Sequence, residues 1–379
     1  MKPVKIIHCG DFHISNEAAL TDASWAARNA RVKKVFLNII DMCREDGTDI
    51  LLIAGDFFDS PKALWQDIIE ISEAFSSIPG TKVFIAPGNH DPACEESPYM
   101  KEDWPDNVHI FKGTAETVVL DDIKTCVTGA GFTMGSCYES MLTDMRVSDK
   151  EDYIQIGVLH GDLSGEGKYN PINKEEIAGS NLDYLALGHI HKRSEVVKSG
   201  NTYYAYCGAP QGRGFDECGS MGIYRGTVSK GFCSLKYAET CISRYEKTEI
   251  DITGCQSSTG IAKAVIDDLH NKFGENYAVN SYRIVLTGET DPEFSLNLQD
   301  IMNYLTDIFY VEIKDMTVPY VDLSGFEDDT SLKGLFVSRI KERLDKAVSL
   351  GDKEEEMLCK KALSLGLKAF LSEVSVNVD

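Results

Sequence analysis

The sequence contains no apolar run that approaches the roughly 20 residues a membrane-spanning helix needs. Its first residues lack the succession of charged, apolar and small residues that forms a signal peptide. It also has no internal repeat, low-complexity tract or coiled-coil heptad run. These absences argue against a membrane protein or a secreted protein, and we expect a soluble protein of the cytoplasm without a membrane partner.

Closely paired cysteines are absent too. The 11 cysteines are scattered, odd in number and never spaced as Cys-x-x-Cys. This pattern suits neither a disulfide framework nor a zinc site built from cysteine pairs. We expect reduced thiols, most of which serve as small buried apolar groups.

Positive charge is scarce. The 379-residue chain has 38 Lys and Arg against 60 Asp and Glu, which gives a net charge of −22. Nucleic-acid-binding proteins are usually basic, so composition alone argues against that class. Divalent cations at an active site, or a partner protein, would supply part of the missing positive charge.

The order of predicted elements indicates a mixed α/β fold. In the first 90 residues, apolar strands alternate with two amphipathic helices, Trp25–Arg44 and 62–78, which favours a parallel sheet covered by helices. From 107 to 160, and similarly in 201–236, short strands are separated by Gly and Asp turns. We expect these strands to pair antiparallel in a second sheet that packs on the first.

A new order begins near residue 245. A strand-helix-strand-helix-strand run of about 75 residues predicts a small separate domain. Two terminal helices follow, and their apolar stripes suit either a core or docking of another protein. We therefore expect a domain over 1–245, a second domain over 246–322 and a helical segment over 323–379.

Five of the apolar strands end in residues that bind metals. The strand ends carry aspartate, asparagine or histidine in every case. They are Asp11 and His13, Asp56, Asn89 followed by His90 and Asp91, His160, and His189 and His191. Five strands are therefore predicted to deliver ligands to one place.

The spacing and chemistry of these residues predict a two-metal site. Asp11 and His13 are two residues apart, as are His189 and His191, so each pair points to one side of an extended strand end. Imidazole, carboxylate and amide ligands suit Mn²⁺, Fe or Zn²⁺, and seven ligands exceed the needs of one tetrahedral ion. Asp56 is the natural carboxylate to bridge two ions.

Phosphoester hydrolysis is the reaction that follows. Two ions about 3.5–4 Å apart activate a water molecule at neutral pH and stabilise the oxygens of an in-line displacement at phosphorus. His90 is spare as a ligand and is predicted to stabilise the phosphate or to protonate the leaving oxygen, with Asp91 orienting its ring. Each histidine alone has an ordinary structural explanation, but five of the eight histidines stand in these strand-end motifs.

The motifs resemble those of the calcineurin-like metallophosphoesterases. In chain order they are Asp11-Phe-His13, Gly55-Asp56-Phe-Phe-Asp59, Gly88-Asn89-His90-Asp91, His160-Gly161-Asp162 and Gly188-His189-Ile-His191. The stretch from Tyr206 to Phe215, followed by Glu217, Gly219 and Gly222, is similar to a segment of the SbcD-type DNA repair exonucleases. The small domain over 246–322 resembles the DNA-capping domain of those nucleases.

This resemblance implies specific roles. One ion is held by Asp11, His13, Asp56 and His191, and the other by Asp56, Asn89, His160 and His189. Manganese is the metal that it implies, and His90 is the catalytic residue. It also implies a homodimer and a partner, an SbcC-type ATPase with a long coiled coil, which the terminal helices would bind.

DNA is the substrate that the resemblance implies, yet the candidate phosphate contacts are few: Lys62, Lys192, Arg193 and Arg213. We therefore keep two alternatives open. The first is a phosphatase or phosphodiesterase of small nucleotides, which needs no extended basic track. The second is a metal-binding scaffold with little turnover, although every ligand position is filled.

Overall fold

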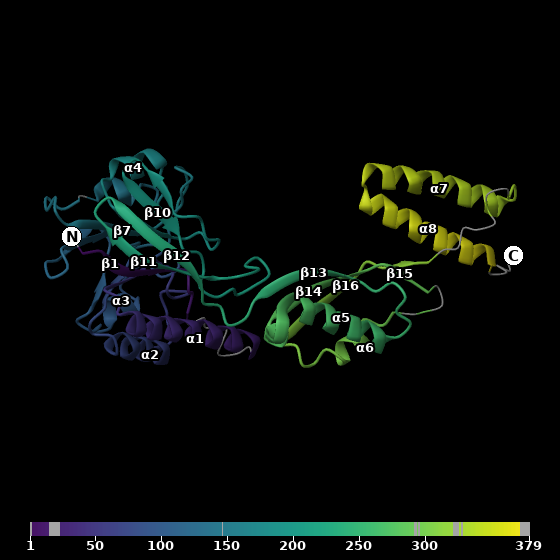
Figure 1. The fold of residues 1–379 in the computed structure, drawn as a ribbon, viewed down its shortest axis with the longest axis horizontal. Coiled ribbons are helices and arrows are strands. Elements are labelled where there is room, and N and C mark those ends of the chain that lie inside the picture. The colour runs from purple at the N-terminus through teal and green to yellow at the C-terminus, as the bar shows by residue number, and fades with distance from the viewer. Residues whose placement is uncertain are drawn as a thin grey trace. The chain divides into compact units, whose positions relative to one another are not determined.

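The computed structural model describes residues 2–14, 23–145, 147–291, 294, 296–320, 326 and 329–371. The chain forms two compact units, residues 1–244 and 245–379 (Figure 1). The three-part division into 1–245, 246–322 and 323–379 stays a prediction, and the boundary between 322 and 323 lies outside the described residues.

A six-stranded sheet with a parallel centre forms the first layer of unit 1. Its strands have the spatial order β12-β11-β1-β2-β3-β4. Their bounds are β1 Val4–Cys9, β2 Ile50–Ile53, β3 Lys82–Ile85, β4 Val108–Ile110, β11 Gly222–Ser229 and β12 Phe232–Glu239. Strands β1, β2, β3 and β4 run parallel, and β11 pairs antiparallel with both β1 and β12. The crossover helices are α1 (Ala23–Asp46) and α2 (Trp65–Ser76), as the sequence predicted.

A second six-stranded sheet packs on the first. Its spatial order is β5-β6-β7-β8-β10-β9. The bounds are β5 Glu116–Leu120, β6 Thr125–Gly129, β7 Ile154–His160, β8 Tyr184–Gly188, β9 Val197–Ser199 and β10 Thr202–Tyr206. The described connections of this unit include the short helices α3 (Pro98–Lys101), η2 (Met141–Asp144) and α4 (Lys174–Gly179).

The strand pairing differs in part from the sequence-based expectation. The second sheet exists, but its central strands β6, β7, β8 and β10 are parallel, and only the edge pairs β5–β6 and β9–β10 are antiparallel. Moreover, β4, β11 and β12 belong to the first sheet. Short strands between Gly turns do not reveal their partners, because β11 pairs with a strand more than 200 residues earlier in the chain.

Alternating side chains of β1 pack on opposite faces of the first sheet, against the helices on one face and the second sheet on the other. Ile7 and Cys9 pack in one apolar cluster with Phe36 of α1. Val4 and Ile6 point to the other face and pack with residues of the second sheet, such as Ile156. Each such side chain, when fully buried, stabilises the fold by about 1.5–3 kcal/mol. The predicted α/β fold, a two-sheet sandwich flanked by helices, is thereby confirmed.

Unit 2 begins with the predicted alternation of strands and helices. Its elements are β13 Tyr245–Asp251, α5 Ser258–Phe273, η3 Gly274–Val279, β14 Ser281–Thr287, β15 Glu289–Thr290, α6 Leu298–Asn303, β16 Tyr310–Asp315 and β17 Val318–Pro319. The strands β13, β14 and β16 form a parallel sheet. Ile261 and Val265 of α5 pack in one cluster with Ile284 of β14. This packing explains why the helix forms where its apolar period predicts it.

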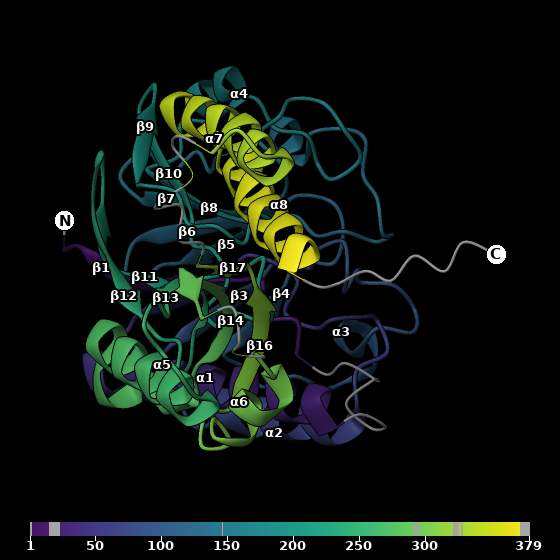
Figure 2. The ribbon, with the colours of Figure 1, turned by 90° about the vertical axis from the view of Figure 1, so that its right-hand side faces the viewer.

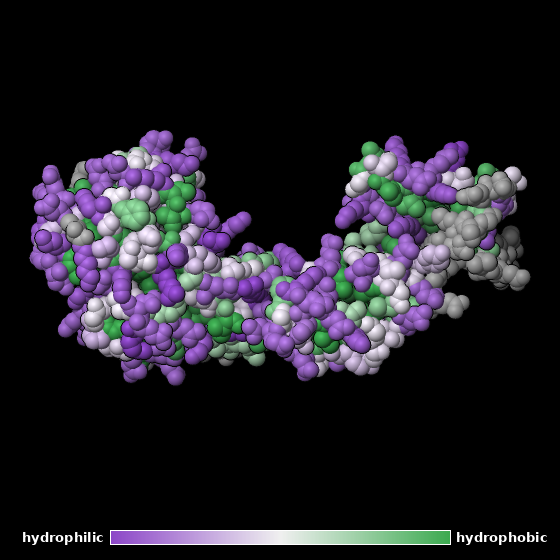
Figure 3. Space-filling view, in the orientation of Figure 1, coloured by the Kyte–Doolittle hydropathy of each residue, from purple (hydrophilic) through white to green (hydrophobic). Residues whose placement is uncertain are grey.

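The last two helices form a hairpin. They are α7 (Leu332–Leu350) and α8 (Lys353–Leu371), which lie side by side in both ribbon views (Figures 1 and 2). Gly351 ends α7 with φ of 70°, the left-handed cap that favours glycine. The hairpin still exposes apolar side chains: Leu332, Leu335, Val348, Leu350, Leu358 and Leu365. Figure 3 shows green, apolar surface on the hairpin. Among the described residues, no helix is long and apolar enough to span a membrane.

Candidate metal centre

The predicted ligands gather where strands of the two sheets end. Those strands are β1, β2 and β3 of the first sheet and β7 and β8 of the second. The carboxyl ends of parallel strands meet at one edge of a sheet. Burial of the site residues increases from the rim inward. His90 is exposed, Asn89, His189 and His191 are half-buried, and Asp11, His13, Asp56 and His160 are buried.

The backbone at the site takes a conformation that non-glycine residues rarely adopt. Asp11, His13, Asp56 and His189 have φ of 53°, 51°, 45° and 102°. They are four of the seven non-glycine residues with positive φ in the described part of the chain. Each such residue costs about 1–3 kcal/mol and persists only where the surroundings hold it. Strain concentrated in this way is typical of a functional site.

Backbone hydrogen bonds hold these strained loops together. The amide of Asp11 donates to the carbonyl of Gly55 at 2.9 Å, and the amide of His13 donates to the carbonyl of Asp56 at 2.9 Å. The ladder between β1 and β2 therefore continues past the ends of both strands. It fixes the carboxylates and the imidazole relative to one another before any ligand binds.

Two glycines of the motifs are required by close approach. A Cβ on Gly88 would lie 2.2 Å from Oδ1 of Asp56, and a Cβ on Gly188 would lie 1.8 Å from the carbonyl oxygen of Ala54. Gly188 ends a strand of the second sheet, whereas Ala54 follows a strand of the first. Only glycine lets the two sheets come this close at the site.

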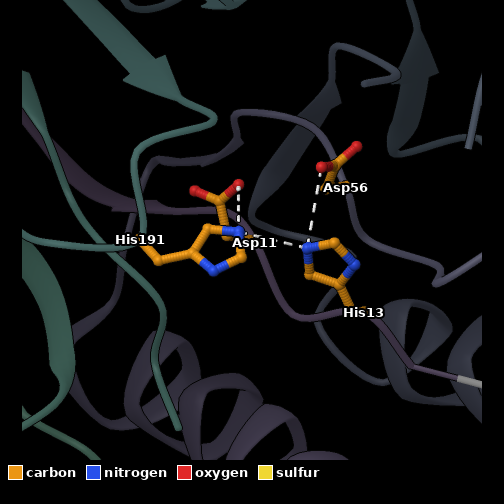
Figure 4. Close-up of side chains that lie close together, drawn as sticks. All are labelled: Asp11, His13, Asp56 and His191. Atoms are coloured by element: carbon orange, nitrogen blue, oxygen red, sulfur yellow. Dashed lines mark hydrogen bonds and ion pairs between the residues drawn. The ribbon is translucent and has the colours of Figure 1, made fainter. Parts of the chain in front are cut away.

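Asp11, His13, Asp56 and His191 form a cluster of possible metal ligands (Figure 4). One ligand atom from each lies within 4.8 Å of the others. Nε2 of His13 is 3.3 Å from Nε2 of His191 and 3.6 Å from Oδ2 of Asp56. Nε2 of His191 is 3.8 Å from Oδ1 of Asp11. These are the four residues that the resemblance assigned to one ion.

Outer carboxylates set the tautomers of both histidines. Nδ1 of His13 lies 3.0 Å from Oδ1 of Asp59, and Nδ1 of His191 lies 2.7 Å from Oε1 of Glu217. Burial would raise the pKa of Glu217, but His191 and Arg213 outweigh it and lower that pKa to about 2. Because an ionised carboxylate only accepts hydrogen bonds, each Nδ1 donates. In the neutral rings, both Nε2 lone pairs then point to the centre of the cluster.

His160 repeats this arrangement and contacts the same carboxylate oxygen of Asp56 as His13 does. Its Nδ1 donates to the carbonyl of Ala54 at 3.0 Å. Its Nε2 lies 3.0 Å from Oδ1 of Asn89 and 3.4 Å from Oδ2 of Asp56. The ring of His189 lies next to that of His160, with 5.1 Å between ring centroids. Asp56 thus contacts one histidine of each predicted ligand set through Oδ2, which fits a carboxylate that both sets would share.

The electrostatics of the site demand positive charge. Burial would raise the pKa of Asp56, but the neighbouring His160 and His13 outweigh it and hold that pKa far below its usual range. Burial would lower the pKa of His160, but Asp56 outweighs it and raises that pKa to about 9. Without metal, a proton on His160 supplies the cation that the carboxylate needs. The inward-facing carboxylates and lone pairs therefore fit divalent metal ions.

His90 lies at the open rim of the site. Its amide donates to Oδ1 of Asp56 at 2.9 Å, and its ring packs edge-on against that of His13 with 4.8 Å between centroids. Since the side chain is exposed, it is accessible to a substrate that approaches the buried ligands. This place suits the catalytic role predicted for it.

Asp91 has other partners than the sequence predicted. Its carboxylate was expected to orient His90, but it accepts hydrogen bonds from the amides of Gly88, Phe57 and Phe58 at 2.7, 2.8 and 3.0 Å, and from the hydroxyl of Tyr99 at 2.5 Å. Asp91 is fully buried. It fastens the loops that carry Asp56 and Asn89 together, which is a structural role.

The four candidate phosphate contacts lie in different surroundings. Arg213 reaches the site, where it contacts Asp59 and Glu217 at 3.5 and 3.0 Å. Lys62 pairs with Glu96 at 3.6 Å, and Arg193 pairs with Glu195 at 3.6 Å and covers the ring of Tyr237. Lys192 is exposed. For the last three, the described contacts include none with a predicted metal ligand.

Asp59 and Glu217 are site residues to which the sequence analysis gave no role. Both stand inside the motifs that carry the resemblance, but each contacts its histidine across a long stretch of chain, 46 residues for Asp59 and 26 for Glu217. A carboxylate on the outer nitrogen of a ligating histidine is a common feature of metal sites. Their places in these motifs were therefore the sequence signal that could have identified them as site residues.

Known proteins share this site region. Residues 4–193 match the family described as calcineurin-like phosphoesterase. The chain is 28% identical over 303 residues to an uncharacterized metallophosphoesterase, YhaO, of Bacillus subtilis, covering 76% of this chain and 73% of that protein. It is 23% identical over 273 residues to the DNA double-strand break repair protein Mre11 of Methanopyrus kandleri, covering 65% of this chain and 57% of that protein.

Among solved structures, one similar chain is TT1561 of Thermus thermophilus. It has a TM-score of 0.39 and 10% sequence identity, and the match covers 63% of this chain and 100% of that chain. A similarity at this level carries no argument about function.

Proposed function

We propose, on the premise that the chain belongs to the calcineurin-like phosphoesterase family, that it is a two-metal phosphodiesterase that cleaves DNA. One observation supports the hydrolytic part of this proposal. The buried carboxylates of Asp11 and Asp56 lie close to Nε2 of three histidines, His13, His160 and His191. Divalent ions held there would activate a water molecule and would stabilise the charge that develops on the phosphate oxygens.

The residues of the chain divide this work. Asp11, His13, Asp56 and His191 hold one ion, and Asp56, Asn89, His160 and His189 hold the other. His90, at the rim, stabilises the phosphate or delivers a proton to the leaving oxygen. Manganese suits these mixed nitrogen and oxygen ligands, as do iron and zinc.

DNA as the substrate rests on two observations. The stretch Tyr206–Phe215 is similar to a segment of SbcD-type exonucleases, and the chain is similar to an Mre11 described as a DNA double-strand break repair protein. We further propose that an SbcC-type coiled-coil ATPase docks on the hairpin of α7 and α8. The exposed leucines of that hairpin support this partner.

A phosphatase or phosphodiesterase of small nucleotides is the second candidate. It is favoured by the net charge of −22 and by the acidic partners that already engage Lys62, Arg193 and Arg213. A small substrate needs no long basic track, whereas DNA binding depends strongly on phosphate contacts.

One comparison tests the proposal. The purified chain is assayed with Mn²⁺ on single-stranded and double-stranded oligonucleotides, on cyclic nucleotides and on bis-nitrophenyl phosphate. We expect oligonucleotide cleavage at low salt. Cleavage of the small diesters alone would favour the second candidate, and two bound metals without turnover of any substrate would indicate a scaffold.

A further inference from the structure

Arg213 links the outer shells of two predicted metal ligands. One guanidinium nitrogen, Nη1, lies 3.5 Å from Oδ1 of Asp59. The other, Nη2, lies 3.0 Å from Oε1 of Glu217. Those two oxygens are the acceptors for Nδ1 of His13 and Nδ1 of His191. One arginine therefore joins two carboxylate-histidine pairs whose four residues come from four separate loops.

The backbone of Arg213 strengthens the same link. Its amide donates to the second oxygen of Glu217, Oε2, at 2.8 Å. Glu217 is thus held at one oxygen by the backbone and at the other by the guanidinium and the imidazole. Because the carboxylate is buried, with 5% of the residue exposed, these bonds fix its orientation with little competition from water.

These contacts leave Arg213 poorly suited to hold a phosphate of the substrate. Both of its terminal nitrogens face carboxylates, and 22% of its side chain is exposed. A substrate phosphate would have to compete with two anions already in contact. The sequence-based interpretation of Arg213 as a phosphate contact therefore fits the geometry less well than a role inside the protein.

We propose that Arg213 is a positioning residue that clamps Asp59 and Glu217 against the outer nitrogens of His13 and His191, and thereby fixes the two imidazoles of one metal site. The inference rests on the proposed metal centre but not on the identity of the substrate. Arginine suits this role because separate nitrogens of its planar fork, Nη1 and Nη2, contact Asp59 and Glu217, whereas a lysine has a single nitrogen for both.

The test measures Mn²⁺ binding to the full, metal-free chain by isothermal titration and counts bound ions by elemental analysis. The variants are Arg213→Met, which removes the charge, and Arg213→Lys, which keeps it. Arg225→Met is the matched control. Arg225 lies on β11, outside the site, where its exposed side chain pairs with Asp46 of α1. Loss of an outer-shell partner typically weakens metal binding 10–100-fold.

We expect both Arg213 variants to bind one of two Mn²⁺ ions about 10–100-fold more weakly, and the control to bind both as the wild type does. With bis-nitrophenyl phosphate, raising Mn²⁺ should restore kcat while KM stays within about twofold of the wild type. Unchanged Mn²⁺ affinity with a raised KM would overturn the proposal and return Arg213 to substrate binding.

A double-variant cycle with Glu217→Gln separates positioning from general destabilisation. Because Arg213 is proposed to act partly through Glu217, the double variant should lose less Mn²⁺ affinity than the sum of the two single losses. Additive losses would contradict the proposal. Should Arg213→Met fail to fold, Arg213→Lys decides, since wild-type Mn²⁺ affinity in that variant would refute the need for the fork. Failure of the chain to cleave DNA would affect only the proposed substrate.

Discussion

Nε2 of His13 and Nε2 of His191 face each other at 3.3 Å, although the other nitrogen of each ring already donates to a carboxylate. In the neutral rings, two lone pairs at this distance repel unless a cation lies between them. Beside Asn89 and Asp56, the ring of His160 is protonated in the metal-free chain, because Asp56 outweighs burial and raises its pKa to about 9; a metal ion would take the place of that proton. The fold therefore preorganises electron-pair donors for a charge that metal ions supply.

Divalent metal should stabilise the folded chain. An ion that binds the folded state alone adds about 2.7 kcal/mol at a concentration 100 times its Kd. We expect Mn²⁺ to raise the Tm of the metal-free chain and EDTA to reverse the shift. Asp56→Asn should lose most of the shift, since Asp56 contacts one histidine of each predicted ligand set. An equal shift in that variant would place the binding elsewhere.

His90 and Asp56 should separate catalysis from metal binding. His90→Ala should retain two metals per chain and lose about 10²–10⁴-fold in kcat, because the residue lies at the rim and acts on the substrate. Asp56→Ala should lose metal. Elemental analysis beside kinetics on a small diester checks both. An empty site in His90→Ala would contradict this division of roles.

The strand-end pattern predicted the site because its signal is local. A run such as Tyr184–Leu187 followed by His189 and His191 shows a buried strand and its ligands within a few residues. Parallel pairing of β1, β2 and β3 then brings such ends together without further information. The sequence therefore sufficed for the two-sheet sandwich and for the gathering of these side chains in one place. The division into two ligand sets and the catalytic role of His90 stay predictions.

Long-range contacts account for what the sequence did not reveal. Asp91 stands beside His90 in the chain, yet its carboxylate is bound by Phe57, Phe58 and Tyr99, which adjacency does not indicate. The same holds for β11, whose pairing with β1 spans most of unit 1. An alternating apolar pattern shows which face of a strand is buried but not which strand lies next to it.

Asp91 should matter for stability rather than for proton transfer. Asp91→Ala removes the acceptor for three buried amides and for the hydroxyl of Tyr99. Each buried donor left without a partner costs about 1–3 kcal/mol. Urea unfolding of the metal-free chain should show a loss of at least about 3 kcal/mol, against about 1 kcal/mol for Tyr99→Phe.

The matched control for that measurement is Asp121→Ala. Asp121 bonds Lys150 and Tyr153 on an exposed surface, so its loss should leave the free energy of unfolding close to that of the wild type. A loss equal to that of Asp91→Ala would show that removal of any aspartate has this effect, and would undermine the structural role assigned to Asp91.

Gly188 should tolerate no side chain. Gly188→Ala would place a Cβ 1.8 Å from the carbonyl oxygen of Ala54, so the two sheets must separate at the site. We expect a lower Tm and weaker Mn²⁺ binding. Gly80→Ala is the control, because a Cβ there meets nothing within 4 Å. Equal Tm values for the two variants would mean that the sheets do not approach as described.

His8 should make the metal-free chain less stable in acid. The ring is fully buried between the hydroxyl of Tyr184 and the carbonyl of Leu187, and burial lowers its pKa from 6.5 to about 3. Between these values the unfolded chain binds a proton that the folded chain does not, so the free energy of unfolding falls as pH falls, by up to about 1.4 kcal/mol per pH unit. Urea unfolding of His8→Gln at pH 6.5 and below should show a slope shallower by up to that amount. Parallel slopes for variant and wild type would show that His8 is not held neutral in the folded chain.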